Sequence, residues 1–140
     1  MQKEASNRIG PVHTDVCLWL DYYGELLSAR QKEIVSLYYD EDLSLSEIAS
    51  LTGLTRQGIH DRIRRGVANL ESYESALALV ERDLKIENIL QQSLRFCEKD
   101  DSDRVRDCLD KLWKILKPGE DVITDVADEG RESRGDNGII

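Results

Sequence analysis

The sequence predicts an all-α protein: a helix-turn-helix bundle extended by a long helix and a short C-terminal helix. Three observations predict this class. Apolar residues recur every three or four positions over most of the chain, which is the period of an amphipathic helix. Serine or threonine stands directly before several of these apolar runs, where helices begin. The 140 residues include only two prolines and nine glycines, too few for the tight turns of a β-sandwich or barrel.

The composition indicates a cytoplasmic protein. The chain carries 28 acidic and 19 basic residues, a formal charge of -9, which opposes indiscriminate binding to nucleic acid or to an anionic membrane. It contains no apolar run long enough to span a bilayer, and its first residues lack the apolar core of a signal peptide. Three widely spaced cysteines, with no C-x-x-C pair, suit a reducing compartment. We therefore expect no membrane partner.

The N-terminal third predicts a polar leader followed by two helices. Residues 1–14 are expected to form a mobile leader. From residue 15, apolar residues at helical spacing form one stripe: Val16, Trp19, Leu20, Tyr23, Leu26 and Leu27. Ser28, with Gln31 three positions later, fits a capping box for a second helix that runs to about Tyr39.

The next segment predicts two further helices that meet at a short turn. Ser44 and Glu47 fit a second capping box ahead of an apolar run. Gly53 follows about two turns later and suits a left-handed position at a helix end. Thr55 can cap the next helix, which is expected to run to about Leu70. The predicted helix-turn-helix domain therefore covers residues 15–70.

Residues 71–117 are expected to supply the long helix and the C-terminal helix. Apolar residues continue at helical spacing beyond Leu70, and after Leu84 they move to a different face. One helix over about 71–98 would therefore present two apolar faces. Ser102 is a candidate cap for a final helix that ends before Pro118. Residues 118–140 hold seven acidic and two basic residues and predict an acidic, disordered tail. Because residues 71–98 would offer two apolar faces, we also expect a homodimer, although the last helix could cover the second face within one chain.

Residues 44–65 carry the functional prediction. A short capped helix, a tight turn with glycine and a second capped helix define a helix-turn-helix, whose second helix can enter the major groove of DNA. Between Thr55 and Leu70 four arginines stand against one aspartate, a local charge of +3. Arginine can contact guanine, and glutamine can contact adenine. The candidate nucleic-acid-binding residues are Thr55, Arg56, Gln57, His60, Asp61, Arg62, Arg64 and Arg65.

The chemistry of these residues suggests a role for several of them in DNA contact, and their charge pattern also has an interpretation without DNA. Thr55 and the first backbone amides of the helix suit binding to a phosphate. Arg62 and Arg65 suit contact with the DNA backbone, which positions the protein on the duplex but carries no sequence information. Alternatively the arginines form a solvated helix face with local ion pairs, for example between Asp61 and Arg64 or Arg65.

The stretches Leu37–Ala49 and Thr55–Arg65 resemble the YlxM family, small bacterial proteins whose helix-turn-helix is similar to region 4 of sigma factors. The resemblance covers about residues 16–94. It implies a regulator tied to the signal recognition particle pathway, and it places Arg56, Gln57, Asp61 and Arg64 at recognition-helix positions. Gly58 departs from the family, which usually has a better helix former there; a glycine inside a helix costs roughly 0.5–1 kcal/mol relative to alanine.

No pattern in the sequence indicates catalysis, a metal or a cofactor. His13 and His60 are isolated from other zinc ligands, and the motifs of hydrolases and nucleotide-binding loops are absent. We therefore expect a protein that is not an enzyme. The leading function is a DNA-binding transcription regulator with duplex DNA as partner. The alternative is an interaction protein that binds signal recognition particle protein or RNA.

Overall fold

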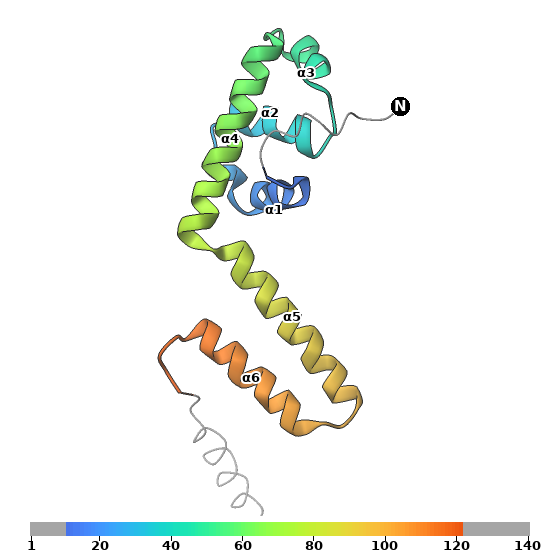
Figure 1. The fold of residues 1–140 in the computed structure, drawn as a ribbon, viewed down its shortest axis with the longest axis vertical. Helices are drawn as coiled ribbons and strands as arrows, with labels where there is room; N and C mark the ends of the chain where they lie inside the picture. The colour runs from blue at the N-terminus through green and yellow to red at the C-terminus, as the bar shows by residue number, and fades with distance from the viewer. Residues whose placement is uncertain (1–10, 122–140) are drawn as a thin grey trace, which may run out of the picture. The chain divides into compact units, whose positions relative to one another are not determined.

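The computed structural model describes residues 11–121, and within them every regular element is helical. Figure 1 shows the order of the elements along the chain. The helices are α1 (His13–Tyr23), the short 3₁₀ helix η1 (Gly24–Leu26), α2 (Ala29–Tyr39), α3 (Leu45–Thr52), α4 (Arg56–Leu77), α5 (Leu79–Glu98) and α6 (Ser102–Leu116). The all-α prediction is confirmed. The chain divides into two compact units between Asp83 and Leu84.

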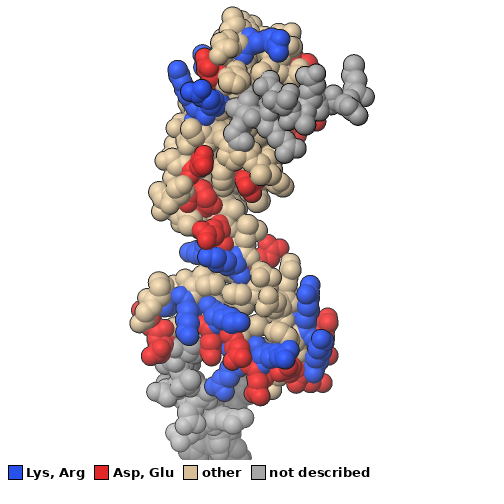
Figure 2. All heavy atoms as spheres, in the orientation of Figure 1, with Lys and Arg blue, Asp and Glu red and all other residues tan. Residues whose placement is uncertain are grey.

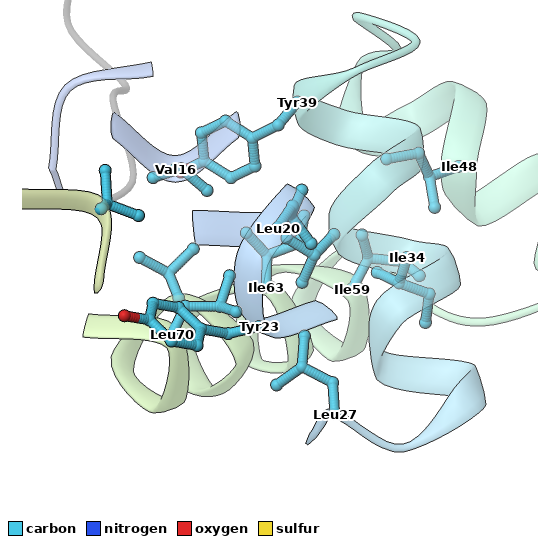
Figure 3. Packing of buried hydrophobic residues seen from close by; sticks show 13 residues of the cluster. Val16, Leu20, Tyr23, Leu27, Ile34, Tyr39, Ile48, Ile59, Ile63 and Leu70 are labelled. Atoms are coloured by element: carbon cyan, nitrogen blue, oxygen red, sulfur yellow. The ribbon is translucent and has the colours of Figure 1, made fainter. Parts of the chain in front are cut away.

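The first unit is built around α4, which packs against α1, α2 and α3. Ile34, Ile59 and Ile63 have no exposed surface and meet between these helices (Figure 3). Burying an aliphatic side chain of this size contributes about 1.5–3 kcal/mol. The complete core consists of Val16, Leu20, Tyr23, Leu27, Ile34, Val35, Tyr39, Ile48, Ile59, Ile63, Val67, Leu70 and Val80.

Local capping starts the helices of this unit largely as predicted. The Ser44 hydroxyl accepts from Glu47 N at 3.1 Å, and the Glu47 carboxylate accepts from Ser44 N at 3.3 Å, so the capping box is complete. Ser28 accepts from Gln31 N at 3.2 Å, which is half of the box expected there. The Gln31 side chain instead accepts from Asn69 of α4 at 3.4 Å, because the α2–α4 packing draws it away from its own helix start.

Gly66 allows α2 and α4 to approach closely. A Cβ atom at this position would lie 2.6 Å from Cγ2 of Val35 and 3.1 Å from Cγ of Gln31. Both Gly66 and Val35 are buried. A helical glycine therefore serves packing here, at a position to which the sequence analysis assigned no role.

The predicted helix over residues 71–98 is wrong, as is the expected end of the preceding helix near Leu70. α4 continues to Leu77, and the chain then breaks at Ala78, whose φ of 51° is left-handed. The first amides of α5 are satisfied from elsewhere: Leu79 N donates to the Tyr23 hydroxyl at 3.1 Å and Val80 N donates to the Glu74 carboxylate at 3.0 Å. A tertiary contact therefore stabilises a break at a residue that is a good helix former.

The second unit contains the rest of α5 and α6, which form an antiparallel hairpin (Figure 1). The cap of α6 is Asp101 rather than the expected Ser102, because the Asp101 carboxylate accepts from Arg104 N at 3.2 Å. The Arg104 guanidinium lies 5.4 Å from the centre of the Phe96 ring. α6 ends at Leu116, close to the predicted end, and its Cys108 is buried.

The predicted leader and tail fall mostly outside the described residues. Residues 1–10 and 122–140 are not described, and α1 already begins at His13, inside the expected leader. The apolar stripe from Val16 to Leu27 belongs to α1, η1 and the start of the next turn rather than to one helix.

Candidate nucleic-acid interface

α3 and α4 form a helix-turn-helix through a turn that local sequence determines. Gly53 adopts a left-handed φ of 73°, and its N–H donates to the carbonyl of Ala49 at 2.9 Å, which ends α3. Thr55 then begins α4, because its hydroxyl accepts from Gly58 N at 3.0 Å. Ile48 of α3 and Ile59 of α4 are fully buried in the same core cluster, and the two helices pack against each other. The predicted motif and its two caps are confirmed.

The helical period separates the candidate residues of α4 into an outward line and two flanks. With 100° between successive residues, Gln57, Asp61 and Arg64 lie on the side opposite the buried Ile59 and Ile63. Arg56 and His60 lie on one flank of this line. Arg62 lies on the other flank, toward the side where Asn69 meets α2. The candidate residues therefore share one helix end without all facing the same way.

The candidate residues also differ in how much of each side chain is exposed to solvent. The exposed candidates are Thr55, Arg56, Gln57, Arg62, Arg64 and Arg65. His60 and Asp61 are partly buried, with 32% and 48% of their side chains exposed. The first three turns of α4 therefore expose their four arginines more fully than Asp61, the one carboxylate among the candidate residues.

Asp61 contacts uncharged or weakly basic neighbours rather than the arginines. Its carboxylate accepts from Gln57 Nε2 at 3.1 Å, and its Oδ1 lies 3.7 Å from His60 Nδ1. Among the described residues, the four arginines of α4 take part in no ion pair. The proposed pairing of Asp61 with Arg64 or Arg65 is thus not found, and the local positive charge is not neutralised within α4.

Positive side chains gather where α3 meets the start of α4. Figure 2 shows blue side chains over this end of the first unit, and acidic residues follow farther along α4. The first amides of α4 point out of the same end without intrahelical acceptors, and the helix dipole adds partial positive charge there. Apart from Gly58 N, which Thr55 satisfies, these donors suit an anion such as a phosphate.

Two further residues, which no sequence pattern indicated, lie beside the candidate residues in the structure. Arg30 of α2 donates to the carbonyl of Thr52 at 3.5 Å, which places its guanidinium beside the end of α3, and the same guanidinium forms an ion pair with Glu33 at 3.0 Å. Leu45 of α3 lines a shallow hollow together with Arg56, Gln57 and His60. The contact of Arg30 with Thr52 and the hollow at Leu45 both join two helices, so no local sequence signal marks either residue.

Other kinds of site find no support in the part of the chain that the structure describes. Residues 11–121 contain no group of three or more side chains that could hold a metal ion. No helix among them is both long and apolar enough to cross a membrane. The Cys17 thiol lies 3.7 Å from His13 Nδ1, but burial raises the pKa of Cys17, and nearby Asp40 raises it further. A raised pKa makes a thiol less reactive.

Comparisons with known proteins agree with this architecture. A curated UPF0122 protein from Acetivibrio thermocellus is 39% identical over 116 residues, which cover 81% of this chain and 95% of the relative. One from Desulforamulus reducens is 39% identical over 97 residues, 69% of this chain and 83% of the relative. The sequence model of the family described as "Putative helix-turn-helix protein, YlxM / p13 like" matches residues 14–117. The chain therefore belongs to the UPF0122 family of YlxM / p13-like helix-turn-helix proteins.

Proposed function

We propose that this protein is a DNA-binding regulator that reads duplex DNA with the start of α4. The observation that carries the proposal is the set of four arginines on α4, which form no ion pair among the described residues and lie on the second helix of a helix-turn-helix. Contact with phosphates and with base edges requires cations at this position that are not already paired.

Gln57 and Arg64 are the proposed base-reading residues. Both are exposed on the outward line of α4. The hydrogen bond from Gln57 Nε2 to Asp61 uses one of two amide hydrogens, which leaves the other hydrogen and Oε1 for the N7 and N6 groups of adenine. Asp61 therefore orients the glutamine amide rather than contacting DNA itself.

Arg62, Arg65 and the N-terminal end of α4 are the proposed phosphate contacts. Arg62 lies on the flank of the helix, where the DNA backbone would pass when the outward line enters the groove. Thr55 caps the helix and keeps its first amides directed outward. These contacts position the helix without reading sequence.

The acidic composition favours selective over indiscriminate binding. A formal charge of -9 weakens the long-range attraction that drives non-specific association with DNA. Binding then depends on the local cations of α4 and on base contacts, so the affinity for random duplex should be low and the discrimination between sequences high.

Selection from a random duplex library with the full-length protein tests the proposal. The expected result is an enriched sequence whose affinity falls steeply as salt rises, since phosphate contacts release counterions. A matched control carries Arg56→Ala, Arg62→Ala, Arg64→Ala and Arg65→Ala and should enrich nothing. If the unaltered chain enriches no sequence and binds no duplex at low salt, the proposal is wrong.

The family resemblance also implies a tie to the signal recognition particle pathway. This second role is tested by affinity purification in which both proteins and nucleic acids are identified. If the particle's protein or RNA is recovered and duplex DNA is not bound, the protein is an interaction protein of the pathway, and the proposal that it reads DNA is wrong. Recovery of specific chromosomal DNA upstream of genes for the particle would make the protein a regulator of that pathway.

A further inference from the structure

The hollow beside the start of α4 has one apolar wall among polar ones. It is lined by Leu45 of α3 and by Arg56, Gln57 and His60 of α4. Leu45 is partly buried, because one side of it packs against the core of the first unit while the rest lines the hollow. The hollow therefore combines hydrogen-bonding groups with a hydrophobic surface, at the end of the helix-turn-helix that reads DNA in the proposed function.

Contacts within α3 and α4 hold the walls of this hollow in place. The complete capping box of α3 fixes the backbone at Leu45, which is the first residue of that helix. Asp61 accepts from Gln57 Nε2 at 3.1 Å, and its Oδ1 lies 3.7 Å from His60 Nδ1. One carboxylate thus contacts two of the polar walls, so the hollow needs little rearrangement to receive a ligand.

Phosphate binding does not account for a leucine in this position. A phosphate is held by N–H donors, and an apolar side chain adds nothing to that contact. Base edges differ, because an A·T pair presents the 5-methyl group of thymine in the major groove beside its hydrogen-bonding atoms. Glutamine suits the adenine of such a pair. Gln57 and Leu45, which line the same hollow, therefore match the two halves of an A·T edge.

We propose that this hollow receives the 5-methyl group of a thymine, and that Leu45 is a specificity-determining residue. The inference rests on the proposed reading of DNA by α4 and adds the base pair that the reading prefers. The thymine is the partner of the adenine that Gln57 contacts. Thymine and 5-methylcytosine both carry this methyl group, but only thymine pairs with adenine. Burial of the methyl group against Leu45 should strengthen binding by about fourfold.

Removal of the methyl group from the DNA tests the hollow without altering the protein. The duplex is the sequence that the full-length chain enriches, and uracil replaces its thymines one at a time. Uracil keeps the hydrogen-bonding groups of thymine and lacks only the 5-methyl group. Replacement at one position should weaken binding, measured by fluorescence anisotropy, by about fourfold. A 5-methylcytosine·guanine pair at that position should bind more weakly than the thymine·adenine pair, because the adenine is lost.

Leucine variants of the full-length protein identify the side chain that contacts the methyl group. Leu45→Ala should bind the thymine and uracil duplexes with less than about a twofold difference, because most of the apolar wall is gone. Leu45→Met keeps an apolar side chain of similar size and should keep the preference for thymine. Leu51→Ala is the matched control: Leu51 lies on the same helix, is 68% exposed and does not line the hollow. It should keep the full difference, and circular dichroism should show unchanged helix content in all variants.

The possible outcomes separate this inference from the proposed function. An enriched sequence whose affinity depends on no thymine methyl group overturns the inference and leaves DNA reading by α4 intact. A preference for thymine that Leu45→Ala retains in full also overturns it, because the contact would then lie elsewhere. A 5-methylcytosine·guanine duplex that binds as tightly as the thymine·adenine duplex overturns the assignment to thymine. If no sequence is enriched at all, the proposed function fails and this inference fails with it.

Discussion

Tyr23 of α1 donates its hydroxyl to the Glu74 carboxylate of α4 at 3.0 Å, across 51 positions of sequence. The same hydroxyl accepts from Leu79 N, and the same carboxylate oxygen accepts from Val80 N. Two side chains thus supply acceptors for the first amides of α5, at the point where the chain leaves α4. Since Tyr23 is only 1% exposed, water cannot replace its hydrogen bonds at little cost.

Tyr23→Phe should destabilise the first unit by about 1–3 kcal/mol, because it leaves the Leu79 amide without its acceptor. Urea denaturation measures the loss, and hydrogen exchange at Leu79 should become faster. Tyr22→Phe is the matched control: Tyr22 donates to Asp83 at 2.8 Å but is 42% exposed, so its loss should cost less. Equal effects of the two substitutions would mean that the buried hydrogen bonds do not stabilise the break.

Gly66→Ala should destabilise the protein by about 1–3 kcal/mol through overpacking, although alanine is the better helix former. The added methyl would lie 2.6 Å from Val35 Cγ2, and both positions are buried. Thermal unfolding of the single variant, of Val35→Ala and of the double variant gives the coupling between them. The double variant should lose less stability than the sum of the two single losses; simple additivity would contradict the close approach.

Arg64→Ala should weaken binding to a selected DNA site by about 1–3 kcal/mol and relax the preference at one base pair. Arg62→Ala should lower the affinity for all sequences about equally, because a phosphate contact carries no sequence information. Fluorescence anisotropy with selected and random duplexes measures both. Arg95→Ala on α5, outside the helix-turn-helix, is the control. Direct reading by α4 is wrong if the folded Arg64 variant keeps full affinity and preference.

Alkaline pH should destabilise the fold through Tyr39. Burial raises the pKa of Tyr39 from 10.0 to about 12, and the neighbouring Tyr38 and Cys17 add to the shift. The folded state therefore binds the proton more tightly than the unfolded state, so this stability is fully present below pH 10 and is lost as the pH rises toward 12. The free energy of unfolding should fall less steeply in that range for Tyr39→Phe. Parallel curves for the two proteins would show that Tyr39 ionisation does not contribute.

Most of the candidate interface could be predicted because its construction is local. Ser44 with Glu47, Gly53 and Thr55 each act within four residues of their own position, so sequence order alone places their hydrogen bonds. The same spacing rules place Arg56, Arg62, Arg64 and Arg65 away from the core. The partial burial of His60 and Asp61 could not be predicted in this way, since it depends on neighbours that packing brings to the start of α4.

The sequence by itself determined the helical class, the helix-turn-helix and the positive start of α4, because periodicity and capping act over one or two helical turns. Only the tertiary structure decided the break at Ala78, the close approach at Gly66 and the position of Arg30 beside Thr52. Each of these depends on partners that are distant in sequence: Tyr23 reaches Leu79 across 56 positions, and Arg30 reaches Thr52 across 22. No local pattern encodes them, since the free energy that selects them comes from contacts that exist only once the helices have packed.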